Sequence, residues 1–372
     1  MTTRSSFYGL LCFSTGDMLT GKEYIRPELH LNIWEKGESV HLDIGLMLDL
    51  DDPSGTVELY FPWPLVGTEG NSPEDIEDLA KRITAQDAIP AVFNESWSVT
   101  IPAKNSGYLI TEPNTNALLF TIVDVGGAVS AKKHQDTAHA LSINVKKLKE
   151  KAISLSPVTP KLYVRFRVRS VPKSFYCVGI DQKDSGWVSS WQRTEIIDFR
   201  LNVRRGVPSN LERSIGPFIE FSKVHLFLMK SRNQDIVFED TLFKSCRSLE
   251  DEEFWAGYAS NGTEADKRKS LLNVKQSIGY QWSKKANRDG GLFVKEFGIL
   301  ARFKKVEFGI GKFLIFALIL GALGNALWDG VKLGYDKIYP TSNLACQSEC
   351  NSTVNPSRSE GAASDEQKGV KK

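Results

Sequence analysis

A continuous uncharged stretch close to the C-terminal end constrains this chain more than any other feature. It runs from Phe313 to Trp328 without a formal charge, although 25% of all residues are charged. As a helix this stretch rises about 24 Å, which is short of the hydrocarbon core of about 30 Å. We therefore expect a transmembrane helix over residues 307–329, with Lys312 and Trp328 as anchors at the two membrane interfaces.

The basic residues on either side of this predicted span indicate its orientation. Those before the span are Arg288, Lys295, Arg302, Lys304, Lys305 and Lys312, and those after it are Lys332 and Lys337. Because cytoplasmic flanks carry the excess of positive charge, we expect a single-pass protein whose N-terminal part is cytoplasmic. The apolar patch from Phe7 to Phe13 is more typical of a first β-strand than of a signal peptide, since a turn follows it.

Alternation with a period of two dominates residues 24 to 240. In the clearest run, apolar side chains alternate with polar ones such as His41 and Asp43. The apolar positions of that run are Val40, Leu42, Ile44, Leu46, Leu48 and Leu50. Such alternation is typical of strands that bury one face. We predict a mainly β fold, an antiparallel sandwich or barrel-like soluble domain followed by helices and one C-terminal transmembrane helix.

The composition is that of a globular protein, and the pattern along the chain changes several times. With 372 residues and a net charge of +2, the chain is long enough for one large or two modest soluble domains. The predicted parts are a β-rich cytoplasmic domain (1–245), a helical connector (246–289), an interfacial amphipathic segment (290–306), the transmembrane helix (307–329) and a disordered tail (339–372). The interfacial segment is expected because bulky apolar residues and cations are mixed there.

Three local predictions accompany this division. A helix is expected over residues 72–83, where Ser72 suits the N-cap. Its apolar stripe is Ile76, Leu79 and Ile83. Residues 131–152 are rich in lysine and are expected to form an exposed, loop-like and partly helical insertion. In the connector, Ile278 and Trp282 are expected on the second of two helices.

Within the predicted span, small or polar residues recur at every fourth position. Ala317, Gly321 and Asn325 share one stripe of the helix, and small residues on a stripe allow two helices to approach closely. The amide of Asn325 also favours a polar partner in hydrocarbon. The pattern indicates self-association through this face. The alternative is that glycine and alanine are simply common in membrane helices and that Asn325 lies near the membrane interface.

The cysteines divide into two groups. Cys12, Cys177 and Cys246 are scattered through the N-terminal part, whereas Cys346 and Cys350 lie close together beyond the span. In an oxidising compartment the second pair could close a small loop with a disulfide. Two free thiols in a disordered tail are the other interpretation.

No spacing of residues predicts a catalytic, metal or cofactor site, so we do not expect an enzyme. The five histidines are too scattered for a metal motif and are expected at the surface. Arg165, Arg167 and Arg169 share one face of a strand and could, with the lysines of 131–152, contact nucleic acid or anionic lipid. A solvated sheet face is the favoured explanation, since no base-stacking motif accompanies the cations.

Two function classes follow from an anchored β-rich domain. One is a sensor-effector whose soluble domain receives a signal and whose span self-associates or perturbs the lipid bilayer. The other is a tail-anchored adaptor that tethers a cytosolic protein partner or regulatory complex to the membrane. An enzyme whose site is assembled from distant loops is a third class that sequence patterns do not exclude.

The layout of a soluble domain joined to a short C-terminal membrane segment resembles the transmembrane effectors of bacterial anti-phage systems, such as those encoded beside retrons or cyclic-nucleotide synthases. The resemblance covers the architecture of the whole chain, and Phe308 to Trp328 is its strongest element. It implies that infection triggers the soluble domain in the cytoplasm. The membrane segment would then damage the cell inner membrane, so that the infected cell dies.

Overall fold

The structure, a computed structural model, separates the chain into two compact units, Met1–Glu307 and Phe308–Lys372. It describes residues 9–15, 25–36, 39–65, 76–83, 88–93, 95–101, 107–134, 138–181, 192–207, 211, 216–260, 263–287, 292–306 and 310–338. The described part of the first unit is mainly β, as the alternation predicts. Residues predicted as a connector and as an interfacial segment belong to the same compact unit as the β-rich part.

The largest sheet runs through the centre of the first unit and contains ten of the described strands. Its order is β16-β17-β14-β2-β3-β11-β8-β7-β6, and β5 pairs with β11 beside this path. The strands are β16 (Phe243–Ser248), β17 (Ser277–Lys285), β14 (Lys223–Ser231), β2 (Glu28–Lys36), β3 (Ser39–Asp49), β11 (Lys161–Val171), β8 (Leu118–Val123), β7 (Gly107–Thr111), β6 (Ser98–Thr100) and β5 (Ile76–Asp78). Two neighbouring pairs, β2 with β14 and β8 with β11, are parallel.

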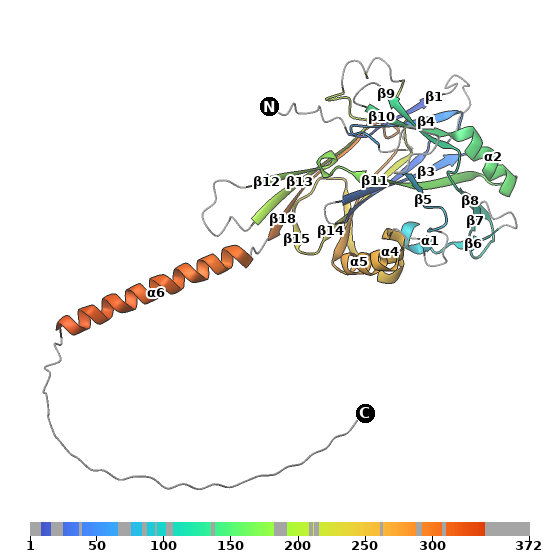
Figure 1. The fold of residues 1–372 in the computed structure, drawn as a ribbon. Helices are drawn as coiled ribbons and strands as arrows, with labels where there is room; N and C mark the ends of the chain where they lie inside the picture. The colour runs from blue at the N-terminus through green and yellow to red at the C-terminus, as the bar shows by residue number, and fades with distance from the viewer. Residues whose placement is uncertain are drawn as a thin grey trace, which may run out of the picture. The chain divides into compact units, whose positions relative to one another are not determined.

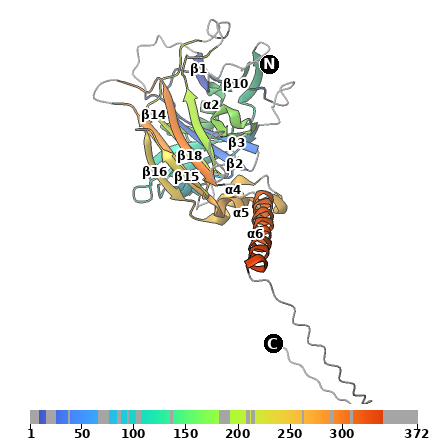
Figure 2. The same ribbon diagram turned by 90° about the vertical axis from the view of Figure 1, so that its left-hand side faces the viewer.

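Two four-stranded sheets accompany the large one. The first, in the order β1-β4-β10-β9, consists of β1 (Leu11–Thr15), β4 (Thr56–Phe61), β10 (Ala138–Asn144) and β9 (Val129–His134). The second, in the order β12-β13-β18-β15, consists of β12 (Cys177–Asp181), β13 (Gln192–Leu201), β18 (Phe297–Val306) and β15 (Gln234–Phe238). Figures 1 and 2 show β1 and β10 at the opposite end of this unit from the helices α4 and α5.

One apolar core joins the three sheets. Leu46 of β3, Leu59 of β4 and Phe199 of β13 all belong to it. On β3 the predicted apolar face is buried, but His41 and Asp43 of the opposite face are buried too. The central strands therefore lie inside the unit on both faces, which the sequence pattern does not indicate.

Short helices cover parts of the sheets. They are α1 (Ala88–Phe93), α2 (Val145–Leu155), the 3₁₀ turn η1 (Lys173–Phe175), α4 (Glu252–Ala259) and α5 (Glu264–Lys275). The two helices of the connector begin with side-chain caps, because Asp251 accepts a bond from the amide of Phe254 and Thr263 from that of Asp266. The acidic residues in each first turn suit the positive end of the helix dipole.

The predicted helix over 72–83 is wrong for its described part. Residues 76–78 form β5, which pairs with β11, and a turn follows to Ile83. Asp78 holds this turn, because its two carboxylate oxygens accept bonds from the amides of Ala80 and Val125 at 2.7 Å. The sheet edge and this carboxylate satisfy the backbone groups that a helix would have satisfied.

The basic insertion at 131–152 is only partly as predicted. Its last part is helical, since α2 begins at Val145 after the N-cap Asn144. Its first part supplies strand residues of β9 and β10 rather than a loop. In the connector, Ile278 and Trp282 lie on β17 and not on a helix. The sequence pattern alone does not reveal these strands, because lysines and small residues weaken the alternation of apolar and polar side chains. They become evident only from their pairing with neighbouring strands.

The interfacial amphipathic segment predicted over 290–306, which we expected to be helical, is not helical over residues 297–306, because these form strand β18. This strand pairs with β13 along its whole length. Its side chains at Ile299, Ala301 and Phe303 are buried, while Leu300 and Arg302 between them are exposed. The mixture of bulky apolar residues and cations is therefore period-two alternation rather than the stripe of an amphipathic helix.

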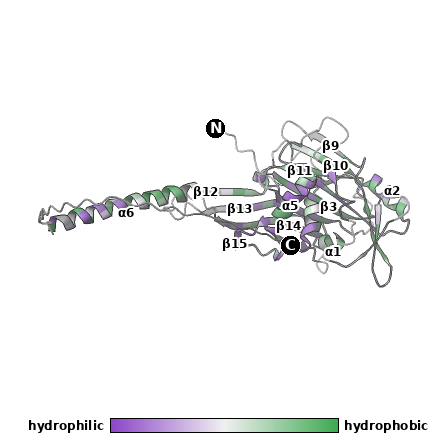
Figure 3. Ribbon diagram, turned by 60° about the horizontal axis from the view of Figure 1, so that its bottom comes forward, coloured by the Kyte–Doolittle hydropathy of each residue, from purple (hydrophilic) through white to green (hydrophobic). Residues whose placement is uncertain are grey.

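The second unit contains α6 (Ile310–Ile338), a helix of 29 residues. Its length of about 44 Å matches a bilayer including the headgroup regions. Residues Leu314–Tyr335 are long and apolar enough to cross a membrane, and Figure 3 shows the apolar residues along it. The C-terminal candidate span is confirmed, and its helix extends nine residues beyond the predicted end at 329. The predicted tail over 339–372 lies outside the described residues.

Candidate functional site

The residues predicted to assemble the span all lie on α6 with exposed side chains. At 3.6 residues per turn, Ala317, Gly321 and Asn325 fall within an arc of roughly 80°. Trp328, predicted only as an interfacial anchor, falls in the same arc at roughly 20° from Ala317. This residue is 70% exposed. The stripe of small residues therefore ends, on the side of the C-terminus, at a large aromatic ring.

The glycines of α6 have no packing role that the described residues account for. A methyl group added at any of them would meet no described atom within 4 Å, apart from the helix's own backbone. These glycines are Gly311, Gly321, Gly324, Gly330 and Gly334. Glycine in a helix interior costs about 1 kcal/mol relative to alanine. Gly321 and Gly324 lie within roughly 40° of Ala317 around the helix, and a second helix that packs closely against that face would offset their cost.

Three further predicted residues cannot be placed in the same way. Cys346 and Cys350 lie outside the described residues, and so does the side chain of Lys312. The disulfide and the second anchor therefore remain predictions. Of the other cysteines, Cys12 and Cys177 are buried free thiols and Cys246 is an exposed one.

A buried charge network in the first unit was not predicted. Asp43 of β3 is fully buried and accepts bonds from Arg167 Nε at 2.6 Å and Arg167 Nη2 at 3.1 Å. Its Oδ2 also accepts from Tyr258 Oη at 2.8 Å and Trp34 Nε1 at 2.9 Å. Burial alone would raise the pKa of Asp43, but the charge and hydrogen bonds of Arg167 hold that pKa below its usual range.

The predicted solvated face of arginines is wrong for two of its three members. Arg165 and Arg167 are 1% and 0% exposed, because α4 covers the face of β11 on which they lie. Arg165 Nε donates to Tyr258 Oη at 2.7 Å and its Nη1 to Tyr163 Oη at 3.0 Å. Arg169 is partly exposed and pairs with Glu77. Arg165 and Arg167 are therefore too deeply buried to contact a nucleic acid or a lipid from this face.

Two guanidinium groups hold the C-terminal end of α4. Arg82 Nη1 donates to the carbonyls of Gly257, Tyr258 and Ser260. Arg167 Nη1 donates to the carbonyl of Tyr258 at 3.1 Å. The last carbonyls of a helix carry its negative dipole end, so both contacts are favourable. Together they attach α4 to the large sheet.

A second charge cluster joins the large sheet to the sheet that contains β18. Lys230 of β14 is fully buried, and its Nζ lies 2.6 Å from Glu35 Oε1 of β2 and 2.5 Å from Glu195 Oε2 of β13. Lys173 Nζ donates to the other oxygen of Glu195 at 2.8 Å, and Tyr176 Oη donates to Glu35 at 2.7 Å. Every carboxylate here meets a cation, which the burial of charge requires.

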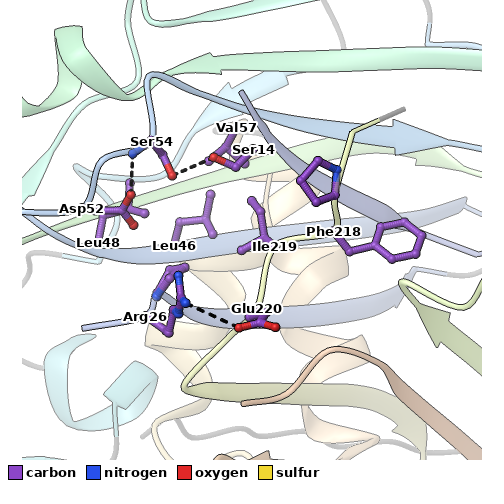
Figure 4. A pocket seen from close by; sticks show the side chains of 12 residues that line it. Ser14, Arg26, Leu46, Leu48, Asp52, Ser54, Val57, Phe218, Ile219 and Glu220 are labelled. Atoms are coloured by element: carbon purple, nitrogen blue, oxygen red, sulfur yellow. Dashed lines mark hydrogen bonds and ion pairs between the residues drawn. The ribbon is translucent and has the colours of Figure 1, made fainter. Parts of the chain in front are cut away.

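A cavity of about 180 Å³ opens between β3, the turn after it and the segment before β14. Figure 4 shows the side chains that line it. They are Ser14, Arg26, Pro27, Leu46, Leu48, Asp52, Ser54, Val57, Pro217, Phe218, Ile219 and Glu220. Ser14 Oγ donates to Ser54 Oγ at 2.8 Å, and Arg26 pairs with Glu220 at 3.6 Å. The cavity thus combines an apolar wall with a few charged groups, as small-molecule sites do.

Asp52 is the most unusual group in this cavity. It is 3% exposed, and its Oδ1 accepts a bond from the amide of Ser54 at 2.7 Å. Its Oδ2 is buried and has no hydrogen-bond partner among the described residues. The sequence offers one signal, a turn-forming Asp51-Asp52-Pro53-Ser54-Gly55 after a strand, but that signal says nothing about burial.

Of the five histidines, His30, His41 and His225 have side chains that the structure describes. Within the described residues, no group of three or more His, Cys, Asp or Glu side chains could hold a metal ion. Contrary to the predicted surface positions, His41 is buried, and the rings of His30 and His225 lie 5.3 Å apart. Burial lowers the pKa of His225 to about 3 and also lowers that of His30. Both are neutral at pH 7.

Comparisons with known proteins add little to this geometry. No family model and no curated protein matches the chain. Among solved structures it is similar to the Fcho1 Mu homology domain of Danio rerio with bound Eps15 peptide, at 10% sequence identity and a TM-score of 0.13. That match covers 77% of this chain and 82% of that chain. So weak a likeness carries no argument about fold or function.

Proposed function

We propose that this chain is a membrane-anchored effector of antiviral defence. In this proposal the β-rich unit lies on the cytoplasmic side of the cell inner membrane and receives a signal or a protein partner. The helix α6 then self-associates in the lipid bilayer and disturbs it, so that the infected cell dies. The observation that carries the proposal is α6 itself, an apolar helix that is rich in glycine and contains one asparagine.

The composition of α6 supports action in the bilayer beyond anchoring. An anchor needs only apolar surface, and leucine would supply it at a lower cost in helix stability than glycine. Asn325 adds an amide to an apolar segment, where a polar group without a partner is unfavourable. Both features become favourable when helices pack together and hydrogen-bond.

The connection between the two units also supports an effector. Strand β18 ends at Val306 and α6 begins at Ile310, so three residues, 307–309, join them. A short connection allows a rearrangement of β13, β18 or β15 to reach the helix. A simple tether gains nothing from such a short connection, since longer flexible linkers are tolerated at little cost.

The test is the membrane potential of single cells after controlled expression of the chain. Rapid depolarisation is expected with the intact chain and not with a chain that ends at Glu307, which keeps β18 and the whole first unit. The double variant Gly321→Leu with Asn325→Leu should leave the potential undisturbed. Its matched control is Ala322→Leu with Ala326→Leu, which adds similar bulk at roughly 140° to 180° from Ala317 and should still depolarise the membrane.

The same assay separates an effector from a tail-anchored adaptor. Exchange of α6 for an unrelated apolar helix of the same length keeps the anchor and removes the small residues and Asn325. An effector loses depolarisation on this exchange, whereas an adaptor keeps its function. A potential that stays undisturbed with the intact chain, both alone and in infected cells, would contradict the effector proposal.

A further inference from the structure

Asp52 lines the cavity, and its buried Oδ2 has no hydrogen-bond donor among the described residues. The turn after β3 fixes this side chain, because the amide of Ser54 donates to Oδ1. Lys149 Nζ donates to the backbone carbonyl of Asp52 and forms no hydrogen bond with Oδ2. A buried carboxylate oxygen without a donor is unfavourable, so native proteins rarely keep one without a reason. Here the carboxylate lines a cavity.

The rest of the cavity wall indicates the size and polarity of a ligand that could bind beside Asp52. Leu46, Leu48, Val57 and Ile219 supply an apolar surface beside the carboxylate. The volume of about 180 Å³ is close to that of an engineered apolar cavity of about 150 Å³ that binds benzene. The body of a matching ligand is therefore about one ring with a short substituent.

The charges around the cavity favour a cation over an anion. Arg26, the one basic residue among the described residues of the wall, already lies against Glu220 and over the ring of Phe293 at 5.0 Å. Glu220 also pairs with Lys295 at 3.2 Å. Asp52 is the acidic group in this wall whose carboxylate forms no salt bridge among the described residues, although the charge of nearby Lys149 acts on it. An anionic ligand would be repelled by it.

We propose that this cavity binds a small organic cation, an ammonium or amidinium group on an apolar body of about one ring. The cationic group pairs with the negative charge of Asp52, and the body packs against Leu46, Leu48, Val57 and Ile219. The inference rests on the proposed function in one respect, since the bound cation would be the signal that the β-rich unit receives. Binding itself does not depend on the action of α6.

The test measures binding of benzylammonium to the full chain in detergent micelles by isothermal titration, with empty micelles subtracted. Saturable binding is expected for the native chain. Asp52→Asn keeps the size of the side chain and removes its charge, and it should weaken binding about tenfold or more. The matched control Asp51→Asn removes the neighbouring exposed charge and should bind like the native chain. Benzyl alcohol, which has the same ring without the charge, should bind more weakly than benzylammonium.

A second variant keeps the test decisive. Val57→Phe leaves Asp52 in place and fills the cavity, so benzylammonium binding should be lost while the thermal unfolding midpoint shows a folded chain. No saturable binding to the native chain, or equal binding to the native chain and Asp52→Asn, would overturn the proposal. Binding without any effect of the cation on membrane potential would leave the ligand site standing and count against the proposed function.

Discussion

Arg167 Nε and Asp43 Oδ1 lie 2.6 Å apart, and neither side chain exposes any surface. The two residues are direct partners in the register of β11 and β3. Tyr258 of α4 bonds to the same carboxylate, so the pair also joins the sheet to the helix. This buried pair fixes the positions of both side chains as well as stabilising the fold, because either charge would be unfavourable if it were buried without the other.

Removal of Asp43 is expected to destabilise the first unit strongly. Asp43→Ala leaves Arg165 and Arg167 buried without a carboxylate, and the free energy of unfolding should fall by about 3–5 kcal/mol. Chemical denaturation of the full chain in detergent, followed by tryptophan fluorescence, measures this change. Asp51→Ala, at an exposed position in the turn after β3, should change it by less than about 0.5 kcal/mol. Equal effects of the two substitutions would contradict the role given to the network.

Acid should destabilise the fold partly through Glu195. Burial alone would raise the pKa of Glu195, but Lys230 and Lys173 lower it from 4.5 to about 2. A carboxyl with a lowered pKa stabilises the fold above its unfolded value, and this contribution is lost as the pH falls from about 4.5 through about 2. In Lys230→Met the loss of stability over this range should be shallower than in the native chain. The unfolding midpoint measured at several pH values checks this, and unchanged slopes would refute it.

Self-association of α6 should depend on one face of the helix. Gly321→Leu with Asn325→Leu blocks close approach and removes the amide, and association in lipid vesicles should weaken about tenfold or more. Energy transfer between labelled chains measures the association as lipid dilutes them. Ala322→Leu with Ala326→Leu should associate like the native chain. Equal loss in both pairs would mean that the small-residue stripe has no special role.

Thiol labelling should reveal the orientation of the chain. The exposed Cys246 belongs to the first unit, whereas Cys346 and Cys350 follow α6. With a cytoplasmic first unit, a membrane-impermeant maleimide applied to intact spheroplasts after mild reduction should label the second pair and spare Cys246. Labelling of the pair only after reduction would also establish its disulfide. Labelling of Cys246 in intact spheroplasts would reverse the predicted orientation.

The period of the hydrophobic pattern and the composition of each segment predict the outline of this fold well. The alternation in β3 and the uncharged stretch in α6 are local signals, so the mainly β body and the C-terminal apolar helix follow from the sequence. Alternation also places Arg165, Arg167 and Arg169 on one face correctly. It cannot predict that α4, about ninety residues later in the chain, covers that face, because burial depends on tertiary packing.

The wrong predictions of secondary structure have a common physical cause. In β18 and β5 the apolar positions fit both a short helix and a strand, and only the partner strands decide between them. The cavity was missed for a related reason. Leu46, Asp52 and Ile219 come from three separate segments, and the burial of one carboxylate oxygen exists only once those segments have met.

The place of β18 in the chain has a consequence for biosynthesis. This strand lies between β13 and β15, so both of them lack a neighbour until residues 297–306 have left the ribosome. The apolar helix follows three residues later. Completion of the first unit and emergence of the apolar helix from the ribosome therefore coincide during translation. A chain delayed at that stage would expose two open strand edges together with a membrane segment, which is a state prone to aggregation.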